Sequence, residues 1–120
     1  VTFSVKPKTA GSVTAIVTTN GVVSGTAVQV VIVKPVITPA TTKVSRTATT
    51  MTIYGFGFDP VAAKNTVVFS NGAIGIVTAA TPTSLTFKFS TTPRNAGSLT
   101  AIVTTNSIST GIAIQIGVVL

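Results

Sequence analysis

The side chains that could carry out chemistry in this chain are few, and their types exclude most catalytic sites. The sequence has no His, no Cys and a single acidic residue, Asp59. General acid–base catalysis needs a group that titrates near neutrality, and a glycosidase needs two carboxylates. Ser and Thr are abundant, but a hydroxyl nucleophile needs an adjacent base, for which Lys is the sole candidate type. We therefore expect no enzymatic activity, no catalytic residue and no cofactor.

Asp59 has two other chemical uses, as a metal ligand and as the acid that assists a Lys–Asn isopeptide cross-link. Zinc prefers His or Cys, and calcium prefers several carboxylates, so one Asp predicts no metal site. Lys64 and Asn65 follow closely in the sequence. These three residues are more typical of one solvated loop, in which Asp59-Pro60 forms a turn, than of a cross-link.

The basic residues give a formal net charge of +7, which raises the question of a nucleic-acid partner. Phosphate binding needs clustered Lys and Arg, whereas these residues are scattered along the chain. We expect no nucleic-acid partner, and Lys at strand ends is typical of solubility and edge protection. The residues concerned are Lys6, Lys8, Lys34, Lys43, Arg46, Lys64, Lys88 and Arg94.

The composition favours an all-β protein. Hydrophobic residues make up 45% of the chain and charged residues 8%, and 24 of the 120 residues are Thr. Val, Ile and Thr are stiff at χ1 and pack well on a pleated surface. No apolar run approaches the ~18 residues of a membrane-spanning helix, so we expect no membrane span. There is no signal peptide or initiator Met, which indicates a mature product or an excerpt.

An internal repeat organises the chain. Residues 1–34 align without gaps on residues 87–120 at an offset of 86, with 17 of 34 positions identical. The best-matched stretch is AGSVTAIVTTN at 10–20 against AGSLTAIVTTN at 96–106. Positions expected to face solvent match as well as apolar ones, which indicates a recent tandem duplication. The sequence therefore predicts one complete unit at 35–120 and, at 1–34, the C-terminal strands of a preceding unit. Half a sandwich cannot bury its apolar face alone, so residues 1–34 must be completed by something else.

Period-2 alternation between turn residues predicts about seven strands in the complete unit. We expect Leu85, Phe87 and Phe89 to point inward, and Ile112, Ile114, Ile116 and Val118 to share one face. Asn20-Gly21 and Asn106-Ser107 are expected to open the last hairpin of each copy. The predicted strands are residues 36–38, 47–54, 66–69, 73–78, 84–90, 98–105 and 112–118.

The complete unit resembles the IPT/TIG domains, a family with an immunoglobulin-like fold found in plexins, Rel-type transcription factors and bacterial surface proteins. The resemblance rests on three motifs in order, Pro-Val-Ile-Thr-Pro at 35–39, Thr-Ile-Tyr-Gly-Phe-Gly-Phe at 52–58 and Asn-Thr-Val-Val-Phe at 65–69. It implies an Ig-like β-sandwich over residues 35–120. The near absence of acids separates the chain from the intracellular members of the family.

The residues of the second motif have a structural interpretation of their own. Gly55 and Gly57 allow a positive φ or a close backbone approach, and Phe56 or Phe58 would close the end of the sandwich. We expect these four residues to form a structural corner.

Few charges leave little to prevent lateral association, so self-assembly is the expected function. Two predicted strands, at residues 28–33 and 112–120, carry almost no charged residues that would block pairing along their edges. We expect a structural module of an extracellular filament, stalk or cell-surface adhesin, whose partners are neighbouring repeats or identical copies. A ligand-binding module, for a glycan or a nucleic acid, is the alternative, although only Tyr54 offers the aromatic stacking typical of sugar sites. The expected assembly edges are Val28, Val30, Ile32, Ile114, Ile116 and Val118.

Overall fold

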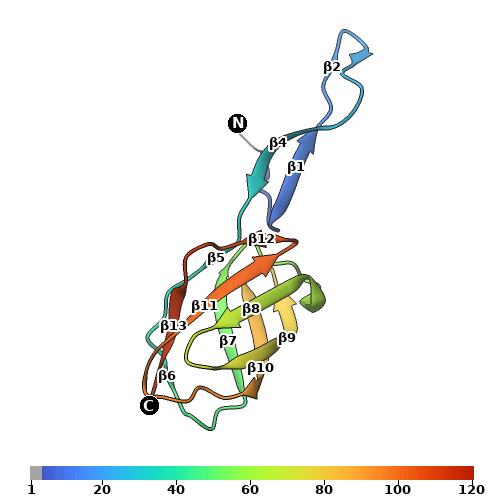
Figure 1. Ribbon diagram of the computed structural model, residues 1–120. Coiled ribbons are helices and arrows are strands. Elements are labelled where there is room, and N and C mark those ends of the chain that lie inside the picture. The colour runs from blue at the N-terminus through green and yellow to red at the C-terminus, as the bar shows by residue number, and fades with distance from the viewer. Residues whose placement is uncertain (1–3) are drawn as a thin grey trace.

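A computed structural model describes residues 4–120, and it confirms an all-β fold (Figure 1). The chain forms a β-sandwich body from residue 35 onward and a β-hairpin that projects from one end of that body. In the described part of the chain the one helical element is a single 3-10 turn, η1 (Ala62–Lys64), and no helix is long and apolar enough to cross a membrane.

The first sheet of the body has four antiparallel strands. Its order is β5-β7-β10-β9, so the central strands β7 and β10 are far apart in the sequence. β10 shows the alternation that its sequence predicts, with Leu85, Phe87 and Phe89 buried. The strands are β5 (Val36–Ile37), β7 (Thr50–Phe56), β9 (Ile74–Thr81) and β10 (Ser84–Thr91).

The second sheet lies across the first and has β11 at its centre. β11 pairs with β8, with β12 and with β13, all antiparallel, and β13 pairs in parallel with the short strand β6. The chain therefore leaves the first sheet after β5 and joins the second at β6. The strands are β6 (Lys43–Val44), β8 (Asn65–Phe69), β11 (Gly97–Thr105), β12 (Ile108–Ser109) and β13 (Ile114–Val119).

The core lies between the two sheets and contains an aromatic cluster. The rings of Phe69, Phe87 and Phe89 contact one another, with centroids 4.6 to 5.4 Å apart. Leu99, Ala101 and Val103 of β11 face this cluster and are fully buried. Such burial supplies roughly 25 cal/mol per Å² of apolar surface, which is the main term that stabilises the body.

The predicted arrangement of the last strand is wrong in one respect. We expected Ile112, Ile114, Ile116 and Val118 on one face, but Ile112 is exposed and Val119, not Val118, is buried. Ile112 precedes β13, which begins at Ile114. A β-bulge accounts for Val119, because Leu99 pairs with Gly117 and Thr100 with Gln115, which leaves Ile116 as an extra residue. An extra residue in one strand moves the inward face by one position.

The N-terminal hairpin extends the molecule to 63 × 22 × 19 Å. It forms a sheet of two strands, with a second short ladder at its far end, and no other strand of the described residues pairs with it. Figure 1 shows the hairpin projecting away from the body, with the C-terminus at the opposite end of the molecule. The strands are β1 (Gly11–Ala15), β2 (Thr18–Thr19), β3 (Val22–Val23) and β4 (Val28–Val33).

Candidate assembly site

The N-terminal hairpin has the same backbone pairing as the last hairpin of the body. β1 pairs with β4 from Gly11↔Val33 to Ala15↔Val28, and β11 pairs with β13 from Gly97↔Val119 to Ala101↔Ile114. Every pair differs by the repeat offset, and both ladders carry a bulge at the same place, after Val13 and after Leu99. The similarity of the two segments therefore extends from sequence to strand register. A shift of one residue in either ladder would have turned its inward-facing side chains to the other face of the sheet.

Side-chain hydrogen bonds also recur in the two hairpins. Ser12 donates to Gln29 at 2.9 Å, and Ser98 donates to Gln115 at 3.1 Å. The backbone N–H of Val17 donates to the Ser24 hydroxyl, as that of Val103 donates to the Thr110 hydroxyl. The tips match as well, since Asn20-Gly21 and Asn106-Ser107 all have positive φ, as a type I′ turn requires. These bonds therefore recur in the hairpin although no second sheet of the described residues covers it.

The two hairpins differ in what covers them. Val103 of the body is 0% exposed, whereas the equivalent Val17 is 59% exposed. Val13 and Ala15 are half-buried where Leu99 and Ala101 are fully buried. The hairpin therefore presents to solvent the face that forms the core in the body. We call this face, made of Val13, Ala15, Val17, Val31 and Val33, the open hairpin face.

The predicted assembly edges lie in different environments. Val28, Val30 and Ile32 of β4 are exposed, and β4 has no strand on its outer side within the described residues. Ile114, Ile116 and Val118 lie on β13, between β11 and β6, and Ile116 is buried. β6 pairs with Val118 and Val119, so it covers this end of β13, and the edge at Ile114 and Ile116 has no ladder partner on that side among the described residues.

A compact junction connects the hairpin to the body. The backbone N–H of Ala10 donates to the carbonyl of Gly57 at 2.6 Å, and Thr9 and Gly57 form a parallel bridge. The side-chain amide of Asn106 donates to the Ala10 carbonyl at 2.9 Å and to the Asp59 carboxylate at 3.0 Å. Ala10 is buried here. The junction therefore fixes the chain before the hairpin to the end of the body that carries Asp59.

Asp59 is buried and ordered, not part of a solvated loop as we expected. Its carboxylate accepts hydrogen bonds from the backbone N–H of Val61 at 2.8 Å and from Asn106. The hydrogen bond from Val61, the amide of Asn106 and the positive charge of Lys64 hold the pKa of Asp59 below its ordinary value of 3.8, and burial opposes this shift. Asp59 therefore accepts these bonds as a carboxylate at neutral pH.

Asn65 occupies the centre of the same loop. Its amide donates to the carbonyls of Asp59 and Val61, and its oxygen accepts from the Asp59 N–H and the Thr105 hydroxyl. With both ends of its amide hydrogen-bonded and buried, Asn65 positions the loop that carries Asp59. This role also accounts for the Asn that opens the third sequence motif.

The four residues of the predicted corner have distinct positions. Phe58 is 0% exposed and lies in the core, whereas Phe56 points out of the sheet. A Cβ on Gly55 would overlap the carbonyl oxygen of Val36 and lie 2.8 Å from the Phe58 ring. Gly57 has φ +83° and lies against Lys34 and Pro35. The glycines therefore let the first strand of the body pass close to the corner, at the junction itself.

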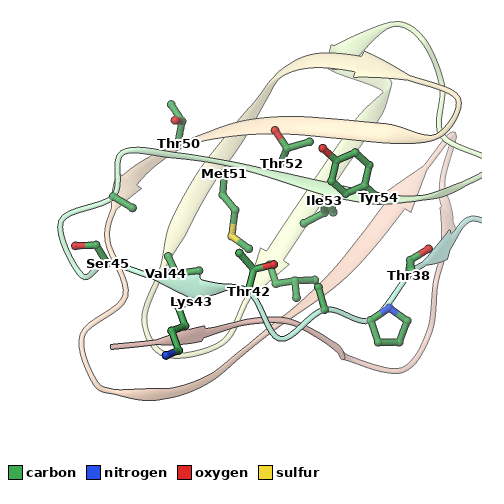
Figure 2. Close-up of a pocket in the computed structure, with 14 residues that line it drawn as sticks. Thr38, Thr42, Lys43, Val44, Ser45, Thr50, Met51, Thr52, Ile53 and Tyr54 are labelled. Carbon is green, nitrogen blue, oxygen red and sulfur yellow. The ribbon is translucent and has the colours of Figure 1, made fainter.

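A cleft of about 410 Å³ opens between β6 and β7, where the chain crosses from one sheet to the other (Figure 2). Met51 reaches into it toward Val44 and Thr42, and Thr50 and Thr52 point away. Lys43 supplies the one charge of its lining. The rest of the lining consists mainly of aliphatic and hydroxyl side chains.

Two aromatic side chains lie exposed on the outer face of β7. Tyr54 and Phe56 are two residues apart on one strand, so they share a face, and they are 64% and 65% exposed. The Thr52 and Thr86 hydroxyls hydrogen-bond each other on the same face at 3.1 Å. Sequence reasoning considered Tyr54 alone, because it placed Phe56 in the corner.

Sequence reasoning missed Ala10 and Asn106 as junction residues. The repeat did contain a signal, since Asn20 and Asn106 are identical and both stand at the tip of a hairpin. The contact between Asn106 and Ala10 could not be predicted from the sequence, because most of the chain separates these residues.

Comparison of the chain with protein-family models, with curated proteins and with solved structures found no match.

Proposed function

We propose that this chain is a structural module of an extracellular filament, stalk or cell-surface adhesin, built from IPT/TIG-like repeats in series. The modules would act by stacking end to end and by strand-mediated self-assembly. The observation that carries the proposal is the hairpin, which repeats the register of β11 and β13 while leaving its core face open.

The strand order supports the immunoglobulin-like part of the proposal. Constant-type immunoglobulin domains have the orders A-B-E-D and C-F-G in their two sheets. In this chain β5-β7-β10-β9 corresponds to the first order, and β8-β11-β13 corresponds to the second. The switch of the first strand from one sheet to the other, at β6, is compatible with the same arrangement.

The positions of the chain ends support a head-to-tail series. The hairpin joins the body at Lys34-Pro35, and Leu120, which aligns with Lys34, lies at the opposite end of the molecule (Figure 1). A following body attached at Leu120 would therefore continue along the long axis. Low charge and the abundance of Thr suit an extracellular surface in which modules contact one another.

Electron microscopy of the native material tests this proposal. We expect fibres or rods with a uniform width close to that of one body. Dispersed single domains at high protein concentration would contradict it.

The exposed pair Tyr54 and Phe56 supports a second candidate, a glycan-binding module. Aromatic faces stack on sugar rings, and hydroxyl groups adjoin the pair. Pull-down on insoluble polysaccharides such as cellulose or chitin should show binding that the double substitution Tyr54→Ala and Phe56→Ala removes. Val68→Ala, which removes an exposed apolar side chain on the other sheet, is the matched control. No binding by the unaltered chain would exclude this candidate for those sugars.

A further inference from the structure

The body shows which strand is missing beside the hairpin. β8 covers the outer edge of β11 from Ala101↔Phe69 to Thr105↔Asn65. The equivalent edge of the hairpin, from Ala15 to Thr19, has no ladder partner among residues 4–120. An edge of unpaired N–H and C=O groups accepts an added strand. By comparison with the ladder between β8 and β11, the added strand would be antiparallel and five residues long.

One hydroxyl also indicates the first residue of that strand. Thr105 is buried in the body and donates to the side chain of Asn65 at 2.8 Å. Thr19 stands at the same place in the hairpin and is exposed. A Thr buried by a β8-like strand would leave its hydroxyl unsatisfied unless that strand began with an acceptor such as Asn. The missing strand therefore has the polar pattern of β8 as well as its length.

The open hairpin face needs a second sheet opposite it. In the body the equivalent residues Leu99, Ala101 and Val103 pack against side chains of the first sheet, among them Phe87 and Ile53. A lone strand added at the edge would leave this face in water. The occupant must therefore supply both the edge strand and the facing sheet, which in the body come from residues 35–86 and the continuation of β10.

We propose that the open hairpin face is covered by a segment with the pattern of residues 35–86, contributed by a preceding repeat of the same polypeptide. The inference rests on the proposed function and specifies the partner of its assembly surface. The hairpin is then the last hairpin of that preceding repeat, and Asn20 occupies there the place that Asn106 has in the body.

A second copy of this chain fits the open hairpin face less well. In such a copy the surface that would receive the hairpin is already filled by its own β11 and β13. The hairpin carries Val13 where the body has Leu99, and Val30 where it has Ile116. Each replacement lacks one methylene, so the hairpin would displace better-packed side chains with smaller ones. Exchange between copies is therefore unfavourable at equal concentration.

A fusion tests the proposal directly. Residues 35–86 are placed immediately before Val1 of the full chain, which continues the alternation of β10 through Leu85, Val1 and Phe3 and gives two full repeats. We expect hydrogen exchange at the amides of residues 15–19 to slow at least tenfold relative to the unfused chain. The added module should unfold with an m-value close to that of the body, because the m-value scales with the surface exposed on unfolding.

Matched substitutions make the fusion experiment specific to the face. Val17→Asp should remove the added protection in the fusion and leave the unfused chain unchanged, since Val17 is exposed there. Thr18→Asp, on the opposite face, should leave the protection in place. If Val17→Asp only aggregates, Val13→Leu serves instead. It should raise the stability of the added module in the fusion, because Leu99 occupies this position in the body.

Two results would overturn the proposal. One is a fusion in which the amides of residues 15–19 exchange as fast as in the unfused chain. The other is protection of these amides in the unfused chain that rises with protein concentration, which would assign the face to a second copy. A fusion that gains protection but forms no elongated assembly would refute the proposed function and leave this inference standing.

Discussion

Asn106 is the residue whose side chain joins the body to the chain just before the hairpin. One side-chain amide donates both to the Ala10 carbonyl, ahead of the hairpin, and to Asp59 in the body. The turn that carries it has positive φ at Asn106 and Ser107, so the amide is presented at the tip of the body. A single polar side chain thus helps to set the angle between hairpin and body.

Replacing Asn106 with Ala should loosen this angle without unfolding the body. The substitution removes the bond to the Ala10 carbonyl, a neutral hydrogen bond worth about 1 kcal/mol net, and also the bond to the Asp59 carboxylate. Spin labels at an exposed hairpin position and an exposed body position should show a broader distance distribution in Asn106→Ala. Asn20→Ala, at the equivalent tip of the hairpin, is the control and should not broaden it. An unchanged distribution would mean that the Ala10–Gly57 bond is sufficient.

Asp59 makes the folded state sensitive to acid. Its pKa is lowered in the folded state, so it contributes stability that is fully present above its ordinary pKa of 3.8. This contribution is lost as the pH falls below 3.8 and through the folded pKa. Asp59 is the sole acidic side chain, and the C-terminal carboxyl titrates in the same range, so the comparison with Asp59→Asn isolates this group. Denaturant midpoints should fall below pH 4 in the wild type, and Asp59→Asn should flatten that fall. An equally steep fall in Asp59→Asn would contradict the assignment.

At the scale of elements, the repeat provides an internal control for packing. Val17 and Val103 are the same residue at equivalent positions of two hairpins with the same register. They differ in burial, because the first sheet of the body covers Val103 and no sheet of the described residues covers Val17. The two hairpins therefore show that the strand register is the same with and without a covering sheet, whereas burial of the valine depends on that sheet.

Val103→Ala should destabilise the body, whereas Val17→Ala should not. Removing two buried methyl groups from Val103 costs about 2 kcal/mol, since each buried carbon is worth about 0.8 kcal/mol and a cavity adds to this. Val17→Ala, at an exposed position, should change the free energy of unfolding by less than about 0.5 kcal/mol. Equilibrium denaturation of both variants gives the comparison. Equal effects would show that the hairpin face is already covered in solution.

Most of the body's strands could be predicted from period-2 alternation, because one face of each sheet is buried. β10 follows this pattern closely, with Leu85, Phe87 and Phe89 inward. The last strand did not follow it, because a bulge at Ile116 arises from pairing with β11 and has no local signal. β6 was missed for a similar reason, since two residues paired with a distant strand carry no periodicity.

At the scale of the whole molecule, the hairpin and the C-terminus lie at opposite ends (Figure 1). The long axis of 63 Å is about three times the other two. Units joined through these ends would add length and not width. The shape therefore agrees with a series of modules along one axis.

Small-angle X-ray scattering of the chain and of the two-repeat fusion should show this directly. We expect the maximum dimension of the fusion to stay close to that of the chain, and its mean cross-section to increase. Because the hairpin already spans that length, the added segment should thicken the hairpin end to the width of the body. A fusion that folds back into a globular particle would contradict a series of modules.

The sequence by itself determined the strand class and the internal similarity at an offset of 86 residues, because alternation, β-branched composition and identity between segments are local properties. It also predicted that residues 1–34 require a partner. Only the tertiary structure decided that Asp59 is buried at a junction, that Asn106 contacts Ala10, and that β6 covers the Val118–Val119 end of β13. Each of these depends on contacts between residues that are distant in sequence, and no local pattern encodes which distant segments meet.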